Sequence, residues 1–238
     1  MARTHSIPVD GEETLEAVHH EAESGRWIVF CHGFLSDKTG SYEYRCKRAV
    51  EEGYNGVRFD FRGCGDSDGE FREAALTSRL EDLAAVLRYF DPDSLVLFGS
   101  SFGGKVAFHA AGGEVDVDGG LEAVVTRAPV TYNRAFETYR GVVDEDGECR
   151  FDTGHVIDAE FFEDFDAYDF ETVARGIDVP VAIFHGGRDD SVPLADSLEA
   201  TGALETDVLL EKYATEGHRF SRAAEDRMLE RVFGWLEV

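Results

Sequence analysis

A serine flanked by glycines stands where an apolar stretch of the chain ends. The residues are Leu95-Val-Leu-Phe-Gly-Ser-Ser-Phe-Gly-Gly104, so Ser101 is the centre of a Gly-x-Ser-x-Gly sequence. In this pattern the serine occupies a sharp turn between a strand and a helix, which exposes its hydroxyl for attack on a carbonyl carbon. The next backbone N–H, that of Phe102, then faces the negative charge that develops on the carbonyl oxygen. Because Gly-x-Ser-x-Gly also occurs in ordinary turns, the interpretation depends on partners elsewhere in the chain.

Partners of the required types occur in two later loops. A serine hydroxyl is a weak nucleophile at neutral pH and needs a base, which in turn needs a carboxylate to orient it. Asp189 follows an apolar run, and His218 ends the sequence Ala214-Thr-Glu-Gly-His218. Because the carboxyl ends of parallel strands converge at one edge of a sheet, both residues can meet Ser101. The chain order serine, aspartate, histidine also occurs in known triads.

Other residues of the same types are alternatives. Ser100 adjoins the nucleophile, and Asp190 adjoins the acid. The other histidines fit the role of base less well, because they fall in a predicted hairpin, inside a helix or in an insertion: His5, His19, His20, His109 and His155. Of these, His155 is placed where it could contact a substrate.

A second oxyanion donor is expected in the turn His32-Gly33-Phe34, which follows the apolar run Trp27-Ile-Val-Phe-Cys31. The glycine permits a tight turn, so the backbone N–H of Phe34 can face the same oxygen as that of Phe102. In this arrangement His32 is structural and is not the base. This chemistry implies no metal ion and no organic cofactor.

Strand-like and helix-like segments alternate along the chain, which favours an α/β fold with a mostly parallel sheet covered on both faces. Strands are expected at Trp27–Cys31, Gly56–Phe61, Leu95–Gly99, Leu121–Thr126, Val179–Phe184 and Asp207–Lys212. Helices are expected where Leu76, Leu80, Leu83 and Leu87 recur at helical spacing, after Ser101, and over Ser221–Leu236. His5–Asp10 and Leu15–Glu21 are expected to form a hairpin joined by Asp10-Gly11.

Residues 130–178 interrupt the alternation and are expected to form a small cap insertion over one end of the sheet. The segment contains many aromatic side chains, which either line a substrate pocket or pack the insertion onto the body. It also contains a predicted turn at Asp144-Glu-Asp-Gly147. Since no linker or repeat divides the chain, residues 1–238 are expected to form a single domain with this cap.

The charge balance is strongly acidic. Asp and Glu total 49 against 23 Lys and Arg, a formal net charge of −26, and only Lys38, Lys47, Lys105 and Lys212 are lysines. Such self-repulsion destabilises a compact state in dilute salt, whereas at about 1 M salt the Debye length falls to about 3 Å. The composition therefore predicts a protein from a salt-loaded cytoplasm, as in extreme halophiles. It also argues against nucleic acid as a partner.

Further features of the sequence suit a cytoplasmic protein. No run of about 18 apolar residues occurs that would span a membrane, and the first residues lack the apolar stretch of a secretory signal. The four cysteines form no Cys-x-x-Cys pair and no zinc-ligand spacing, which indicates reduced thiols. The oligomeric state is left open.

Together the motifs resemble the α/β-hydrolase fold family over essentially the whole chain. The matching pieces are His32-Gly33-Phe34, Phe59–Gly69, Gly99–Gly103, His185-Gly-x-x-Asp189-x-x-Val-Pro193 and Gly217-His218. The resemblance implies an α/β-hydrolase fold, the catalytic residues Ser101, Asp189 and His218, and the oxyanion donors Phe34 and Phe102. The stretch Phe59–Gly69 is similar to the family's turn after its fourth strand, which is architectural.

Within the family the chain resembles small serine esterases and thioesterases. Gly33–Gly40 is similar to the branch of mitochondrial acyl-protein thioesterases that also cleave acyl glucuronides, and the insertion resembles that of feruloyl-type esterases. A serine at position 101 argues against haloalkane dehalogenases, which have aspartate there, and against dienelactone hydrolases, which have cysteine.

The expected function is therefore hydrolysis of a small-molecule carboxylic ester or thioester through an acyl-enzyme on Ser101. One alternative is an aminopeptidase-like amide hydrolase, since related family members cleave peptides with the same triad. The other is a non-catalytic binding protein of the same fold. Such proteins normally lack a triad member, and here Ser101, Asp189 and His218 are all present.

Overall fold

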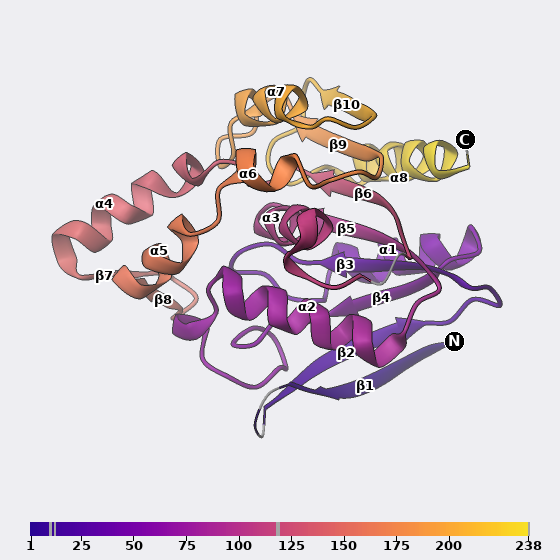
Figure 1. The fold of residues 1–238 in the computed structure, drawn as a ribbon, viewed down its shortest axis with the longest axis horizontal. Coiled ribbons are helices and arrows are strands. Elements are labelled where there is room, and N and C mark those ends of the chain that lie inside the picture. Colours follow the sequence, from indigo (N-terminus) through magenta and orange to yellow (C-terminus); the bar gives the residue numbers. More distant parts are fainter. Residues whose placement is uncertain (10, 12, 118–119, 238) are drawn as a thin grey trace.

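An eight-stranded sheet runs through the molecule (Figure 1). The computed structural model describes residues 1–9, 11, 13–117 and 120–237. The strands are β1 (Ala2–Pro8), β2 (Thr14–His20), β3 (Arg26–Cys31), β4 (Asn55–Phe59), β5 (Ser94–Ser100), β6 (Leu121–Arg127), β9 (Val181–Gly186) and β10 (Val208–Tyr213). Their order is β1-β2-β4-β3-β5-β6-β9-β10. The pairs β1–β2 and β2–β4 are antiparallel and all other pairs are parallel, which confirms the mostly parallel α/β sheet.

Helices cover both faces of this sheet because its central strands are apolar on both sides. In β3, Val29 belongs to one core cluster and its neighbours Ile28 and Phe30 to the other. The helices α1 (Ser41–Glu51) and α8 (Arg222–Leu236) pack over Ile28 and Phe30. The opposite face is covered by α2 (Leu76–Phe90), α3 (Phe102–His109) and α7 (Leu194–Ala203), with the short helices η1 (Phe71–Glu73) and η2 (Ala110–Glu114).

The expected insertion lies between β6 and β9 and extends beyond the end of the sheet, at the left of Figure 1. It consists of η3 (Asn133–Phe136), α4 (Glu137–Asp146), β7 (Glu148–Arg150), β8 (Val156–Asp158), α5 (Ala159–Asp166) and α6 (Phe170–Ala174). The predicted turn over Asp144–Gly147 is wrong for its first three residues, which continue α4 as an exposed acidic face. Only Gly147 turns, with φ 82° and its N–H donated to the carbonyl of Val143 at 2.8 Å.

Several strand boundaries differ from the expectation; β9, for example, spans Val181–Gly186 and not Val179–Phe184. The hairpin forms, but β1 begins at Ala2 and ends at Pro8. As an edge strand it buries only Ile7 completely, so its apolar signal is weak. The expected joining turn includes Asp10, which lies outside the described residues. The strand expected to reach Phe61 ends at Phe59, because the Phe61 N–H donates to the ring of His32 and not to a neighbouring strand.

All four cysteines are free, buried thiols: Cys31, Cys46, Cys64 and Cys149. Burial raises the pKa of each thiol, for Cys31 to about 12. Among the described residues, no helix combines the length and apolarity that crossing a bilayer requires.

The parallel strands β3, β5, β6, β9 and β10 all end at the same edge of the sheet. The loops that leave this edge carry the residues singled out from the sequence: Phe34, Ser101, Asp189 and His218. The insertion lies over the same edge.

Candidate active site

Ser101 occupies a strained turn between β5 and α3. Its backbone has φ 54° and ψ −119°, a conformation that side-chain-bearing residues rarely adopt and that costs about 1–3 kcal/mol. Three backbone hydrogen bonds stabilise this turn. The Ser101 N–H donates to the carbonyl of Arg127 at 3.0 Å, and the Ser101 carbonyl accepts from the N–H groups of Gly104 and Val130, both at 2.9 Å.

The glycines around Ser101 are required by close backbone contacts. A Cβ on Gly103 would lie 2.2 Å from the carbonyl oxygen of Cys31, and one on Gly99 would lie 2.3 Å from that of Gly103. On the facing loop, a Cβ on Gly33 would lie 3.2 Å from the Cβ of Ser101. The end of β3 therefore packs directly against the serine turn, as the two glycine-containing motifs together require.

His218 and Asp189 form a direct hydrogen bond. Their atoms Nδ1 and Oδ2 are 2.8 Å apart; the carboxyl group is fully buried and the imidazole is 21% exposed. Because a carboxylate only accepts, Nδ1 carries the proton and donates it. In the neutral ring Nε2 is then unprotonated and able to accept a proton.

Asp189 is held as a carboxylate by several donors. Its Oδ1 accepts from the N–H groups of Ser191 and Val192, both at 2.9 Å. Its Oδ2 also lies 3.3 Å from Nε2 of His185. Burial opposes the charge, but the hydrogen bonds from His185, His218 and the Val192 amide outweigh it and hold the pKa of Asp189 well below its usual range.

His185 is a part of this site that sequence reasoning did not assign. The ring is completely buried at the end of β9. Its Nε2 faces two acceptors, the Val192 carbonyl at 3.0 Å and Asp189, so Nε2 carries the proton. Its Nδ1 then accepts from the Ser197 hydroxyl at 2.7 Å. The signal was present as a histidine four residues before Asp189.

A cavity of about 450 Å³ opens at this edge of the sheet. Its lining includes Ser101 and His218 together with Phe34 of the β3 loop. The opposite wall comes from the insertion and the Asp189 loop: Val130, Ala135, Phe136, Tyr139, Asp190, Ser191 and Val192. The structure thus brings the serine, the histidine and the expected oxyanion loop to one cavity.

Both expected oxyanion amides are unused. Phe102 is the first residue of α3, so its N–H has no carbonyl partner within the helix. In the part of the chain that the structure describes, neither the Phe102 nor the Phe34 amide donates to another group. The Phe34 and Phe102 rings pack together with their centroids 5.8 Å apart, which fixes the two loops relative to each other.

The alternative residues make other contacts in the structure. The Ser100 side chain is buried and accepts from Nη1 of Arg45 at 2.8 Å. Asp190 lines the cavity, but the carboxylate that bonds His218 is that of Asp189. His155 packs its ring on Phe71, with 4.2 Å between centroids, and does not line the cavity.

His32 is structural, as expected. Its Nε2 accepts from the Phe61 N–H at 3.1 Å, so Nδ1 carries the proton and donates to the Gly33 carbonyl at 2.9 Å. Complete burial lowers the pKa of His32 to about 3. The neutral ring therefore links the β4 loop to the loop that carries Gly33 and Phe34.

The motif Phe59–Gly69 supports the loop after β3 through Asp60. The buried Asp60 carboxylate accepts from the backbone N–H of Lys38 at 2.5 Å, from its ammonium group at 2.6 Å and from the Asp66 N–H at 2.9 Å. A Cβ on Gly65 would collide with this carboxylate at 2.1 Å. These contacts fit the expected architectural role.

Two buried basic residues were missed by sequence reasoning. Arg127, at the end of β6, donates through Nη1 to the His218 carbonyl, while its own carbonyl accepts from Ser101. Lys105 of α3 reaches into the insertion, where its ammonium group bonds Asn133 Oδ1 at 3.0 Å and the Tyr168 carbonyl at 2.8 Å. The only signal in the sequence was a charged residue in an otherwise apolar segment.

The chain belongs to the alpha/beta hydrolase family, whose model matches residues 28–234. This match confirms the family resemblance and the fold expected from the motifs.

One curated relative and two solved structures are similar to this chain over most of its length. Human mitochondrial palmitoyl-protein thioesterase ABHD10 is 26% identical over 220 residues, which cover 85% of this chain and 70% of the human protein. Among solved structures, mouse alpha/beta hydrolase domain-containing protein 10 has a TM-score of 0.87 at 19% identity, covering 99% of this chain and 98% of that one. Est1E from Butyrivibrio proteoclasticus with ferulic acid bound has a TM-score of 0.84 at 20% identity, covering 98% and 97%. At these identities the two structures show the shared fold.

Proposed function

We propose that the protein is a serine hydrolase that cleaves small-molecule carboxylic esters or thioesters through an acyl-enzyme on Ser101. The observation that carries the proposal is the 2.8 Å bond between His218 and Asp189 beside a cavity that Ser101 also lines. The family supports hydrolysis, and a relative named as a palmitoyl-protein thioesterase supports the cleavage of an acyl bond of this kind.

In this mechanism the Ser101 hydroxyl attacks the carbonyl carbon while Nε2 of His218 takes its proton. Asp189 keeps His218 in the tautomer that makes Nε2 the base and stabilises the imidazolium that forms. The N–H groups of Phe34 and Phe102 stabilise the tetrahedral oxyanion, and removing one such donor costs about 2.7–4 kcal/mol in related cases. The imidazolium protonates the leaving group, and water then attacks the acyl-enzyme with His218 again as base.

The insertion 130–178 serves as the cap that shapes the acyl pocket. Phe136 and Tyr139 line the cavity, whereas Phe161 and Phe165, on α5 of the cap, are buried against the Phe102 ring. This division supports a pocket-lining role for some of the aromatic residues and a packing role for others. An apolar wall of this kind suits an aliphatic or aromatic acyl group.

The test is hydrolysis of p-nitrophenyl esters from acetyl to dodecanoyl in about 2–3 M KCl, where surface repulsion is screened. Ser101→Ala should abolish hydrolysis, and a fluorophosphonate should label wild type but not this variant. Ser100→Ala is the matched control and should retain labelling. Failure of well-folded wild type to hydrolyse esters or thioesters, or retained turnover in Ser101→Ala, would overturn the proposal; cleavage of amino-acid arylamides instead would favour the amide hydrolase.

The charge of −26 leads us to propose a salt-loaded cytoplasm as the protein's location. The same acidity supports a small-molecule substrate in preference to nucleic acid.

A further inference from the structure

A second cavity, of about 420 Å³, adjoins the catalytic one and shares Leu35 and Arg219 with it. Its lining contains three arginines, Arg45, Arg127 and Arg219. In a chain with a net charge of −26, a concave site with three guanidinium groups is a local exception. Its remaining wall consists of Ser36, Asp37, Thr39, Gly40, Ser41, Tyr42, Phe220 and Glu225.

Two acidic residues face the same cavity, but both are already engaged. Glu225 pairs with Nε of the buried Arg45. The Asp37 carboxylate accepts from the backbone N–H of Thr39 at 2.7 Å and from its hydroxyl at 2.5 Å. Neither acid lies within ion-pair distance of Arg127 or Arg219 among the residues described.

Arg127 and Arg219 therefore supply positive charge that no ion pair neutralises in the described structure, while the carboxylates of Glu225 and Asp189 act on Arg127 at longer range. Arg127 is only 8% exposed, and its Nε has no hydrogen-bond partner in the described structure. Burial, followed by the neighbouring charge of Arg45, lowers the pKa of Arg127 to about 10, so the group stays protonated at neutral pH. Arg219 is exposed and lines both cavities, which places it between them.

The N-terminus of α1 adds to the positive electrostatic potential of the second cavity. Gly40 is the N-cap of this helix, and no side chain caps its first amides. Thr39, Gly40 and Ser41 all line the cavity. The start of an eleven-residue helix combined with buried arginine is a favourable environment for an anion.

We propose that this second cavity binds an anionic group, a phosphate or a carboxylate, on the leaving group of the substrate. The inference deepens the proposed function and rests on it, because the proposed mechanism determines which side of the substrate carbonyl carries the leaving group. His218 must reach the leaving group to protonate it, and the second cavity is built from the residues that flank His218: Arg219 and Phe220 follow it, and Arg127 bonds its carbonyl. The first cavity, whose cap wall carries Phe136 and Tyr139, then receives the acyl group.

The first test measures binding without turnover. Phenyl phosphate and benzoate are added separately to wild type, Arg219→Gln and Arg88→Gln in about 2 M KCl, where long-range repulsion is screened but direct contacts persist. Arg88 is exposed on α2, on the other face of the sheet, so its variant changes the net charge equally. At least one ligand should raise the melting temperature of wild type and Arg88→Gln by several degrees and that of Arg219→Gln by much less. No rise in wild type, or equal rises in all three proteins, would overturn the anion site whether or not the protein is a hydrolase.

The second test uses butyrate esters whose phenol leaving groups differ only at the para position: carbamoyl, carboxylate or phosphate. Losing one charged contact should lower kcat/KM for at least one anionic ester about tenfold in Arg219→Gln. The ratio of kcat/KM for an anionic ester to kcat/KM for the neutral carbamoyl ester separates this effect from a general loss of activity. Arg88→Gln should keep the wild-type ratio. An unchanged ratio in Arg219→Gln would place the anion elsewhere, whereas absence of turnover of every ester by wild type would contradict the proposed function and leave the binding result to decide the anion site.

Discussion

The orientation of one imidazole decides whether the proposed mechanism operates, and Asp189 controls it. An amide at position 189 presents an N–H₂ group as well as an oxygen, so Nδ1 of His218 can accept and Nε2 then carries the proton. That tautomer cannot take a proton from Ser101. We expect Asp189→Asn to lower kcat by about 10⁴-fold with little loss of folding.

The neighbouring acid provides the matched control for this prediction. Asp190 lines the cavity but does not bond His218, so Asp190→Asn should keep kcat within a few-fold of wild type. The measurement is steady-state hydrolysis of the best p-nitrophenyl ester at several pH values. Equal losses in both variants would contradict the assignment of Asp189.

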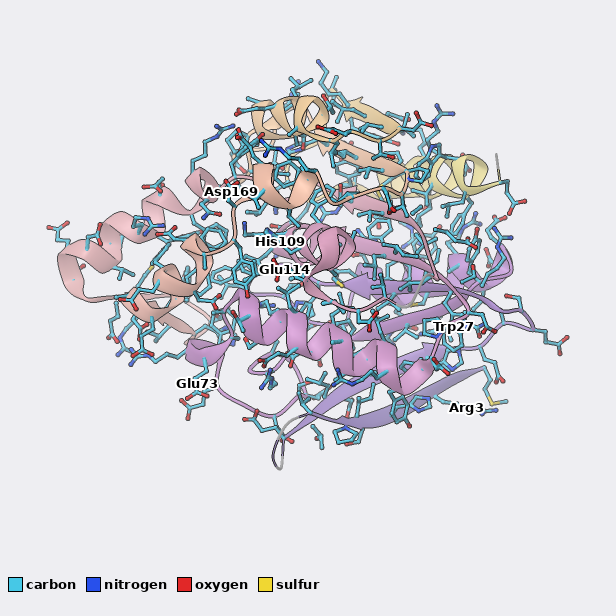
Figure 2. All side chains as sticks on the ribbon, in the orientation of Figure 1. Arg3, Trp27, Glu73, His109, Glu114 and Asp169 are labelled. Atoms are coloured by element: carbon cyan, nitrogen blue, oxygen red, sulfur yellow. The ribbon has the colours of Figure 1, made fainter. Side chains whose placement is uncertain are left out.

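His109 provides a residue-scale test of pH dependence. Figure 2 labels it on α3 and labels Asp169 on the segment of the insertion that follows Tyr168. The His109 ring packs edge-on against Tyr168, and neither of its nitrogens has a hydrogen-bond partner in the described structure. Burial, with a smaller effect from Lys105, lowers the pKa of His109 from 6.5 to about 3.

The sign of the effect follows from this depressed pKa. Between about pH 6.5 and 3 the unfolded chain binds a proton at His109 that the folded protein does not, so stability falls as the pH falls. His109→Leu should therefore lose less stability than wild type between pH 7 and pH 5, by about 2 kcal/mol. Urea unfolding in concentrated KCl measures this difference. Parallel pH profiles would show that the ring is protonated in the folded state.

At the scale of elements, the close contact between the end of β3 and the serine turn predicts that a larger residue at position 103 destabilises the fold. Gly103→Ala places a methyl group into the carbonyl oxygen of Cys31, and backbone atoms cannot move aside cheaply. The substitution should destabilise the protein by several kcal/mol or prevent folding. Thermal unfolding of the purified variant, or its recovery in soluble form, measures the effect.

Gly141 is the matching control within a helix. It lies on the exposed side of α4, its φ is not positive, and a methyl group added there would have no other described atom within 4 Å beyond its own helix backbone and chain neighbours. Gly141→Ala should raise stability by about 0.5–1 kcal/mol, because alanine loses less entropy in a helix. A melting temperature for Gly103→Ala near that of Gly141→Ala would contradict the close packing.

A comparison of the elements with the sequence patterns shows which features could be predicted from the sequence. Continuous apolar runs such as Leu95–Gly99 predicted the buried strands well, since both of their faces are covered. The edge strand β1 and the acidic end of α4 were placed less accurately because their exposed faces carry no apolar pattern. Arg127 and Lys105 could not be assigned at all, because their partners are a carbonyl of His218 and groups of a cap that only the tertiary fold brings close.

For the whole molecule, the dominant quantity is its charge. The acidic residues lie mostly at the surface, so their repulsion is strongest in dilute buffer. We expect the melting temperature to rise steeply as KCl increases from about 0.1 M to about 2 M, where the Debye length falls from about 10 Å to below about 3 Å. Calorimetry or circular dichroism measures the trend. A melting temperature independent of KCl would contradict the proposed origin in a salt-loaded cytoplasm.

Because all four native thiols are buried, one cysteine introduced at the surface can be labelled selectively and used to follow the motion of the cap. A cysteine introduced at Glu163, on the exposed side of α5, would be the fastest-reacting thiol in the folded protein. A maleimide dye attached there reports on one known position without removal of the native cysteines. Fluorescence anisotropy with and without a substrate analogue can then show whether the cap moves relative to the cavity that Ser101 and His218 line.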